Sequence, residues 1–284
     1  MLGMSSITRF LPKNHLSFIV GKLVHLPLPR FIWIPIIKIF SKIYNIKIEE
    51  AEKTISEYES LGDFFVRRLK PGLRPLGLSW AVHPADSVIT QLSSIENGNL
   101  IQAKNKFYKA HDFLQDSEAY KKYNHGFFVT YYLCPTDYHR VHSPVDGVIT
   151  KVTHIPGMLW PVNKWSTENI EEMFSINERV CVEIKTDRGF VNAVFVGATN
   201  VGYIELNFMP EIKGNHFNVF KPLTKENLNI PIKRGEELGL FRMGSTVVML
   251  YQDGVLTSDQ AAEVRKLNLQ YKDFPVKVNS DFFN

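Results

Sequence analysis

Three short segments of the chain concentrate side chains that carry out acid–base and nucleophilic chemistry. They are HPAD at residues 83–86, YHRVHSP at 138–144 and MGST at 243–246. Together they supply a carboxylate, Asp86, an imidazole, His142, and a hydroxyl, Ser245. In a relay of these three types the carboxylate orients the imidazole, and the imidazole removes the hydroxyl proton. The residue types therefore permit an Asp–His–Ser relay, and the fold must bring the three together.

The two histidines of the second segment also allow a metal site. His139 and His142, joined by a carboxylate, have donor types that bind transition metals. Their spacing puts both rings on one face only in a helix, and Pro135 and Pro144 disfavour a helix here. A third interpretation involves neither a relay nor a metal site. In that case Asp86 is an ordinary turn residue, and the two histidines are packed or surface side chains. We predict no metal site.

The composition excludes several classes of protein. With 44% hydrophobic residues, 22% charged residues and two cysteines, the 284-residue chain is typical of a globular protein without a disulfide framework. Its net charge of +4 is uneven, because residues 1–48 hold seven Lys or Arg and no acid. The rest is mildly acidic. A nucleic-acid-binding protein carries its positive charge on the folded face that meets phosphate, so no nucleic-acid partner is predicted.

The basic N-terminal segment is also strongly apolar. Residues 31–44 read FIWIPIIKIFSKIY, a pattern that predicts a helix. Its apolar face would carry Trp33, Ile36, Ile37, Phe40 and Tyr44. We favour an interfacial membrane helix over a helix packed on the protein's own core. The uncharged runs are much shorter than the roughly 18 residues of a membrane span, and no signal-peptide cleavage site follows them.

The remainder of the chain has the sequence pattern of a β protein, in which short strands are separated by turns. A helix is expected to begin at Ser60 and to end by Pro71, after which short β-branched and aromatic runs alternate with turn residues. The predicted strands are 127–133, 148–153, 180–184, 191–196, 201–206, 238–241 and 246–251. The predicted fold class is α+β: membrane-associating helices within residues 1–75, then a β-rich, sandwich- or barrel-like catalytic domain over 76–284.

One internal repeat lies within the β-rich part. HPADSVIT at 83–90 and SPVDGVIT at 143–150 share five of eight residues. Pro-x-Asp forms a tight turn and Val-Ile-Thr begins a strand, so we expect two related hairpin elements that meet in one domain. With the run at 232–241, the second copy resembles the hairpins of biotinyl and lipoyl carrier domains, a likeness of fold that implies no function.

From residue 60 onwards the chain resembles the bacterial, membrane-associated phosphatidylserine decarboxylases. The stretches that carry the resemblance are FFVRRLKPGLRP (64–75), HPADSVITQL (83–92), YYLCPTDYHRVHSPVDGVIT (131–150), PGMLWPVN (156–163), NERVCVEI (177–184), VFVGATNVGYIE (194–205) and KRGEELGLFRMGSTVVML (233–250). The YHRVH and GST motifs, in that order, are the most specific. Two positions depart from the family pattern: Met243 replaces a Leu, and Ser87 replaces a Gly.

The resemblance implies a self-cleaving proenzyme. Autocatalytic serinolysis between Gly244 and Ser245 would give a β chain, 1–244, and an α chain, 245–284, that stay together. Asp86 and His142 would activate the Ser245 hydroxyl, and His139 would assist decarboxylation or protonation of the product. Ser245 would become a covalent pyruvoyl group (pyruvate), the one cofactor implied.

The implied reaction converts phosphatidylserine to phosphatidylethanolamine and CO2 through a Schiff base between the substrate amine and the pyruvoyl group. It needs no metal. The implied location is the cytoplasmic face of the cell membrane, as a peripheral protein, with phosphatidylserine as the membrane partner. A homodimer is left open.

Two other functions fit the same residues. A membrane-associated hydrolase would use Asp86, His142 and Ser245 without self-cleavage, and would remain an intact chain with esterase activity. A non-enzymatic lipid-binding or carrier-like module would also stay intact, and Ser245→Ala would bind lipid as well as the wild type. The number of matching segments favours the decarboxylase over both.

Overall fold

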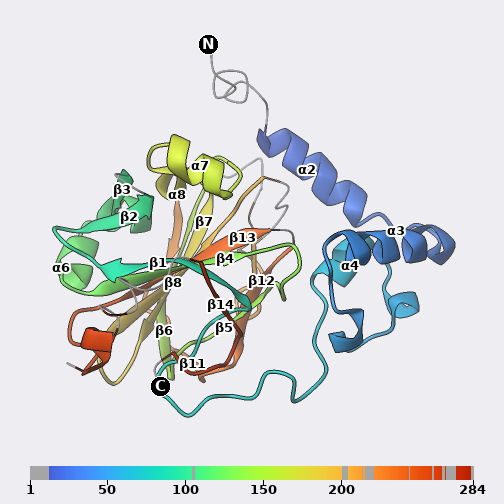
Figure 1. Ribbon diagram of the computed structural model, residues 1–284. Coiled ribbons are helices and arrows are strands. Elements are labelled where there is room, and N and C mark those ends of the chain that lie inside the picture. Colours follow the sequence, from blue (N-terminus) through green and yellow to red (C-terminus); the bar gives the residue numbers. More distant parts are fainter. Residues whose placement is uncertain are drawn as a thin grey trace.

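The protein combines N-terminal helices with a large antiparallel sheet, which confirms the predicted α+β class. The computed structural model describes residues 13–103, 106–199, 204–212, 214, 221–242, 244–257, 259–263, 266 and 273–282. Figure 1 shows the helices to one side of the sheets, joined to them by an extended segment. The predicted domain division after residue 75 falls in this segment and stays a prediction.

The helical part consists of two longer helices and several short ones. They are α2 (Lys13–Val24), α3 (Arg30–Ile43), α4 (Leu61–Phe65) and the 3-10 turns η1 (Ile48–Glu50) and η2 (Ile55–Glu57). Within the described residues, no helix has the length and apolar character needed to cross a membrane. The start of α4 is as predicted, because the Ser60 hydroxyl accepts a hydrogen bond from the Asp63 N–H at 3.0 Å and caps the helix.

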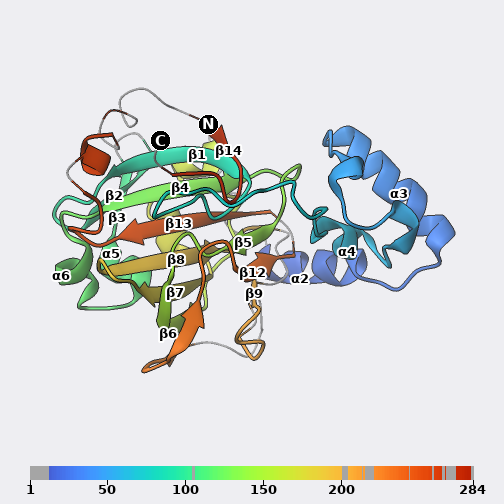
Figure 2. The same ribbon diagram turned by 90° about the horizontal axis from the view of Figure 1, so that it is seen from below.

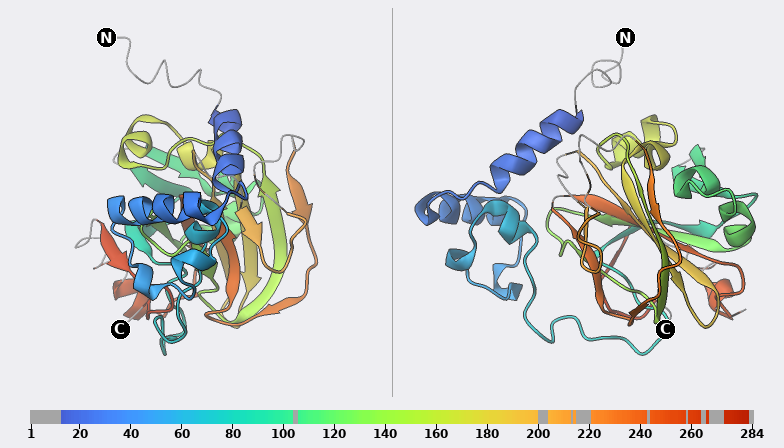
Figure 3. Two further views of the ribbon diagram at one scale, coloured as in Figure 1. Left: turned by 90° about the vertical axis from the view of Figure 1, so that its right-hand side faces the viewer. Right: turned by 180° about the vertical axis from the view of Figure 1, so that it is seen from behind.

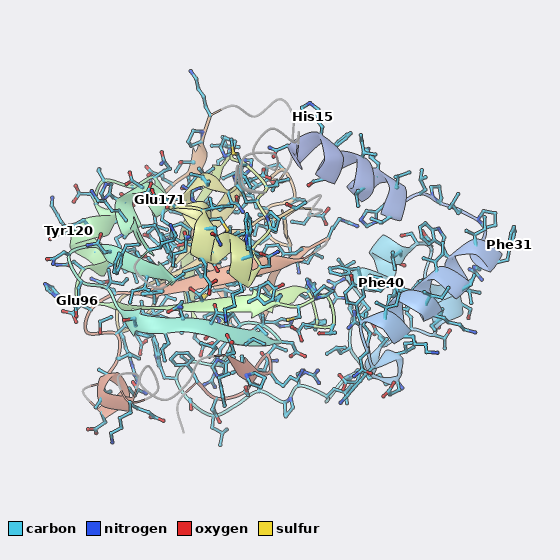
Figure 4. All side chains as sticks on the ribbon, turned by 45° about the horizontal axis from the view of Figure 1, so that its top comes forward. His15, Phe31, Phe40, Glu96, Tyr120 and Glu171 are labelled. Carbon is cyan, nitrogen blue, oxygen red and sulfur yellow. The ribbon has the colours of Figure 1, made fainter. Side chains whose placement is uncertain are left out.

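Only part of the predicted apolar face of α3 is available to a membrane, because Ile36 and Tyr44 are exposed but Trp33 and Ile37 are not. Trp33 and Ile37 are buried in a small core with Tyr58 and Phe64, and the Trp33 indole N–H donates to a backbone carbonyl. Exposed apolar side chains that lie outside the predicted face include Phe31, which is 77% exposed. Figure 4 shows Phe31 at the end of α3 that is far from the sheets, whereas Phe40 lies toward α4. The i, i+3, i+4 pattern therefore marks the face that packs on the helical core.

The β-rich part is dominated by a nine-stranded antiparallel sheet in the order β10-β6-β7-β8-β13-β4-β1-β14, with β11 also paired to β6. Its strands are β1 (Ser87–Ser94), β4 (Phe127–Leu133), β6 (Gly147–Ile155), β7 (Arg179–Lys185), β8 (Phe190–Val196), β10 (Leu223–Lys225), β11 (Ile230–Ile232), β13 (Ser245–Tyr251) and β14 (Phe274–Val276). A smaller sheet has the order β5-β12-β9, with β5 (Arg140–His142), β12 (Glu237–Phe241) and β9 (Ile204–Leu206).

The remaining elements lie around these two sheets, as the two views of Figure 3 show. They are the hairpin β2 (Asn99–Ala103) and β3 (Lys106–Lys109) and the short helices α5 (Ala110–Leu114), α6 (Ala119–Tyr123), α7 (Lys164–Asn169) and α8 (Met173–Ile176). Every strand that the sequence predicted is present, although the first half of the run 201–206 lies outside the described residues. Strands β7, β8 and β13 are buried along almost their whole length, which explains their continuous apolar sequences.

The two copies of the internal repeat meet, as expected. The Val82 N–H donates to the Pro144 carbonyl at 2.9 Å, and the His142 N–H donates to the Pro84 carbonyl at 2.8 Å. Each copy then continues into a strand, β1 or β6, that pairs with a short partner strand, β14 or β11. The likeness of these hairpins to carrier domains stays a prediction.

A second repeat, which sequence reasoning missed, supplies the partner strands. IPIKRG at 230–235 and FPVKVN at 274–279 occupy equivalent registers, with Pro231 opposite Val148 and Pro275 opposite Val88. The last residue of each has a positive φ, +80° at Gly235 and +68° at Asn279. Both residue types tolerate this left-handed conformation, so the two turns are chemically as well as geometrically equivalent.

Candidate active site

The Gly244–Ser245 bond lies at the start of a central strand. β13 runs between β4 and β8, as Figure 2 shows, and its first residue, Ser245, is opposite Leu133. Four residues earlier, the Phe241 N–H donates to the His139 carbonyl at 3.0 Å. The connection 134–138 therefore faces the chain on either side of Met243, at Arg242 and Gly244, at this end of the sheet. The Ser245 side chain lies outside the described part of the chain, as does Met243.

The described residues leave room for a side chain at Gly244. A Cβ atom built on this residue would meet no heavy atom of the described residues within 4 Å, its chain neighbours aside, whereas one on Gly239 would lie 2.3 Å from the Glu205 carbonyl oxygen. The backbone at Gly244 is therefore free of the close packing that surrounds Gly239 in the neighbouring strand. Among the described residues, packing therefore does not crowd the Cβ side of the backbone before Ser245.

His139 is a buried, neutral base. Its Nδ1 lies 3.0 Å from the Asp137 carbonyl, and because a carbonyl only accepts, Nδ1 carries the proton. Nε2 then holds a lone pair, and it is buried without a hydrogen-bond partner in the described part of the chain. The Phe65 ring packs 4.1 Å from the imidazole, centroid to centroid. Burial, with the charge of Arg67, lowers the pKa of His139 to about 3 although the hydrogen bond opposes this, so the ring stays uncharged at neutral pH.

His142 lies farther along the second segment, opposite Glu237 on β12. Its Nδ1 donates to the Gly235 carbonyl at 2.7 Å, and its Nε2 accepts from the Tyr138 hydroxyl at 3.2 Å. Burial lowers the pKa of His142, so this ring is also neutral at physiological pH. The Gly235 carbonyl therefore fixes the tautomer, which is the task that the relay gives to Asp86.

Asp86 is held by cations and a backbone amide. Its carboxylate accepts hydrogen bonds from Arg74 Nη2 at 2.6 Å, from Lys277 Nζ at 3.2 Å and from the Val278 N–H at 2.9 Å. Burial alone would raise the pKa of Asp86, but the Arg74 hydrogen bond and the charge of Lys277 outweigh it and lower the pKa. The carboxylate is therefore charged and fully coordinated.

The structure brings some of the expected site residues together and not others. His139 and Ser245 belong to the two facing segments at the end of β4 and β13. Asp86 and His142, both described, have separate sets of hydrogen-bond partners, so the direct contact that the relay needs is not formed. Arg74 competes successfully for Asp86 because a bidentate guanidinium is a stronger partner than a neutral imidazole.

Sequence reasoning missed the cations of the site. Arg74 and Arg67 lie in the stretch 64–75, which was noted only for its family resemblance, and Lys277 lies in the unnoticed second repeat. A long charged side chain and its partner can be any number of residues apart in the sequence, so no sequence motif predicts these contacts. Only the folded structure shows them. Among the described residues, no cluster of three or more His, Cys, Asp or Glu side chains is arranged to hold a metal ion.

The comparisons with known proteins decide the family. A family model described as phosphatidylserine decarboxylase matches residues 61–272. A Myxococcus xanthus protein named phosphatidylserine decarboxylase proenzyme is 38% identical over 259 residues, which cover 90% of this chain and 92% of that protein. The chain belongs to the phosphatidylserine decarboxylase family. A Shewanella baltica protein of the same name is 39% identical over 261 residues, 89% of each chain.

Phosphatidylserine decarboxylases are carboxy-lyases that are made as proenzymes, and self-processing to a pyruvoyl form is typical of the family. The family match includes β4, β5, β12 and β13, the four strands that border the Gly244–Ser245 bond. A Vibrio cholerae phosphatidylserine decarboxylase proenzyme, 37% identical over 259 residues, covers a similar share of the chain, 89%. The resemblance seen in the sequence is thus confirmed at the level of the family.

The buried, neutral state of His139 predicts a pH effect on stability. The unfolded chain protonates this ring near its ordinary pKa and the folded chain near 3, so stability is complete above the unfolded value and falls as pH drops. By pH 5 the loss from this ring is about 2 kcal/mol. Urea unfolding at pH 7 and pH 5 should show a smaller loss for His139→Asn than for the wild type. His111→Asn, at an exposed ring, is the control. Equal losses in all three proteins would contradict a buried neutral His139.

Proposed function

We propose that this chain decarboxylates phosphatidylserine to phosphatidylethanolamine and CO2, using a pyruvoyl group formed from Ser245 after cleavage of the Gly244–Ser245 bond. The observation that carries the proposal is family membership over residues 61–272, combined with a scissile bond that begins a central strand and faces the segment of His139. The alternative hydrolase, without self-cleavage, gains no support from the comparisons.

The cleavage step needs only groups of this chain. The Ser245 hydroxyl oxygen bonds to the Gly244 carbonyl carbon while the C–N bond breaks, so an amide becomes an ester and the hydroxyl proton passes to the new amine. We propose His142 as the base that moves this proton, with Nδ1 held by the Gly235 carbonyl and Nε2 as the acceptor. Asp86 supports the step electrostatically. For direct contact with His142 it would have to leave Arg74.

The pyruvoyl group follows in two steps: the ester eliminates the Gly244 carboxylate and leaves dehydroalanine at residue 245, and a water molecule then replaces its nitrogen, which leaves as ammonia, so the keto oxygen comes from water. Open space at Gly244 and the unpartnered Nε2 of His139 fit such a group, because a new chain end and a substrate both need room and a proton carrier. When formed, it supplies an electrophilic carbonyl that accepts the electrons of the departing carboxylate. His139 then holds or returns the proton at the substrate α-carbon, and Phe65 excludes water from its ring.

The proposal also accounts for the association of the two chains. The α chain would contain β13, which lies between β4 and β8, and β14, which pairs with β1. The Lys277 ammonium and the Val278 amide would bind Asp86 of the β chain. Backbone hydrogen bonds along two edges of β13 therefore hold a 40-residue fragment without the peptide bond.

A set of substitutions separates the proposed roles. Ser245→Ala should remain a single chain and form no phosphatidylethanolamine from phosphatidylserine vesicles, because it lacks the nucleophile. His142→Ala should cleave much more slowly than the wild type. His139→Ala should cleave and then lose most decarboxylase activity. Gel analysis of processing and assay of the product lipid measure these outcomes.

The two histidine variants also show which result would contradict these roles. If His139→Ala fails to cleave while His142→Ala cleaves normally, the roles of the two rings are exchanged, as the β4–β13 register alone would favour. If Ser245→Ala forms product at the wild-type rate, the pyruvoyl proposal is wrong.

We further propose that the helical part binds the membrane peripherally, at the cytoplasmic face. Apolar side chains are exposed on both long helices: Ile19, Leu23, Phe31, Ile36, Ile39 and Ile43. Lys38 and Lys42 lie on α3 beside them, and basic side chains are attracted to the anionic lipids of that leaflet. Apolar side chains that remain exposed next to lysines are the pattern of an interfacial helix.

The exposed face predicts the effect of charge on vesicle binding. Ile39→Asp combined with Ile43→Asp should lower the bound fraction on phosphatidylserine-containing vesicles several-fold, because two carboxylates would enter the interface. Leu223→Asp, at an exposed leucine on β10, is the matched control and should bind normally. Co-sedimentation with vesicles measures both. Unchanged binding of the double variant would exclude this face as the membrane contact.

A further inference from the structure

Arg67 has a buried guanidinium group, and only one of its three nitrogens donates hydrogen bonds to described residues. The residue is 5% exposed, and its Nη2 donates to the Thr136 carbonyl at 3.0 Å and to the Asp137 carbonyl at 3.4 Å. Its Nε and Nη1 are buried and have no hydrogen-bond partner among the residues that the structure describes. Among the described residues, no carboxylate forms an ion pair with it. Burial lowers the pKa of Arg67, yet a guanidinium stays charged at any physiological pH.

A second buried arginine shows how unusual this is within the same molecule. Arg179 is as deeply buried, and each of its three nitrogens donates to at least one backbone carbonyl. Arg179 is therefore a structural residue with every group satisfied. A buried charge with two unused nitrogens is costly unless something else pairs with it, so Arg67 calls for an anion.

Arg67 lines a cavity in which such an anion fits. The cavity has a volume of about 140 Å³, and its lining includes the cations Arg74, Lys47 and Lys277 as well as the acidic residues Glu50, Asp86 and Asp137. At ~30 Å³ for each water molecule, that volume holds a phosphate-sized group. Arg74 is already neutralised by Asp86 and Glu50, and Lys277 also contacts Asp86. Arg67 is therefore the cation of this cavity that has no carboxylate of its own.

The cavity is adjacent to the candidate active site. Asp137 and Tyr138 of the connection 134–138 form one wall. The Asp137 carbonyl accepts from Arg67 Nη2 and also from His139 Nδ1 at 3.0 Å, so the two side chains are neighbours on one oxygen atom. Asn45 and Lys47, which also line the cavity, belong to the helical part, whose exposed apolar side chains we propose as the membrane contact.

We propose that Arg67 binds a phosphate-type anion in this cavity. The inference rests on the proposed function in one respect, since it identifies the anion as the phosphodiester of the lipid headgroup. A phosphodiester carries one negative charge and several acceptor oxygens, which suit a guanidinium with two free nitrogens. Held there, the headgroup would keep its amine on the His139 side of the site. Arg67 is thus a substrate-binding residue, and Lys277 of the α chain adds a second cation at the cavity.

The test compares Arg67→Gln and Arg67→Lys with Arg68→Gln in the full-length protein. Arg68 is the neighbouring arginine, half exposed and paired with Glu237, so it is a matched control for loss of one charge. Two soluble probes, inorganic phosphate and glycerophosphoethanolamine, are titrated while 31P NMR line broadening and thermal stability are recorded. The half-saturating concentration of phosphatidylserine in mixed micelles and the turnover number are measured separately.

For the wild type we expect both probes to bind and to raise the melting temperature. Arg67→Gln should weaken binding of both probes at least about tenfold, the loss expected for one charge-assisted hydrogen bond. It should raise the half-saturating phosphatidylserine concentration by a similar factor and change the turnover number less. Arg67→Lys should recover part of the affinity, and Arg68→Gln should match the wild type.

Other outcomes would overturn the inference. If Arg67→Gln binds both probes like the wild type, Arg67 only supports the connection 134–138, even if the variant is less stable. If inorganic phosphate binds and glycerophosphoethanolamine does not, the ligand is a free phosphate and not a headgroup. A wild type that binds the probes at Arg67 but forms no phosphatidylethanolamine would refute the proposed function and leave the anion site standing.

Discussion

The antiparallel pairing of β13 with β4 is the interaction on which the rest of the site depends. It aligns Ser245 with Leu133, and the next contact along the chain aligns Phe241 with His139. Two short connections are left facing each other between these fixed points. Because β13 also pairs with β8, its register cannot slip without breaking the hydrogen bonds to both neighbours and exchanging its buried side chains between the two faces of the sheet. The Gly244–Ser245 bond, which we propose to be the cleavage site, is thereby held in one place at the start of this strand.

A cluster of charges around Asp86 joins the other parts of the molecule to this sheet. Arg74 links Asp86 to Glu50 of the helical part, and Lys277 and the Val278 amide link it to the C-terminal segment. The equivalent residue of the second repeat, Asp146, accepts only from the Arg234 amide in the corresponding way. Both copies of the repeat therefore form the hydrogen bond from a backbone N–H to the Asp carboxylate. Only the first copy, at the cavity of Arg67, adds the side chains of Arg74 and Lys277.

The sequence predicted the parts of the fold that depend on local pattern. Strands such as Phe127–Leu133 and the cap of α4 at Ser60 follow from residue types and spacing. The burial of Trp33 was not predictable in the same way, because one amphipathic pattern describes both a helix that faces lipid and one that packs on its own core. The contacts of Asp86 and Arg67 were also missed, since long charged side chains choose partners by the fold and not by spacing. The roles assigned to Asp86, His139, His142 and Ser245 stay predictions.

Intact-mass spectrometry of the purified protein under denaturing conditions tests the central claim most directly. The account predicts two chains, residues 1–244 and 245–284, with the smaller one lighter by one ammonia than a peptide that begins with Ser245. Ser245→Ala, measured in parallel, should give one full-length mass. A wild-type preparation that forms phosphatidylethanolamine as a single uncut chain, or as chains cut at another bond, would contradict it.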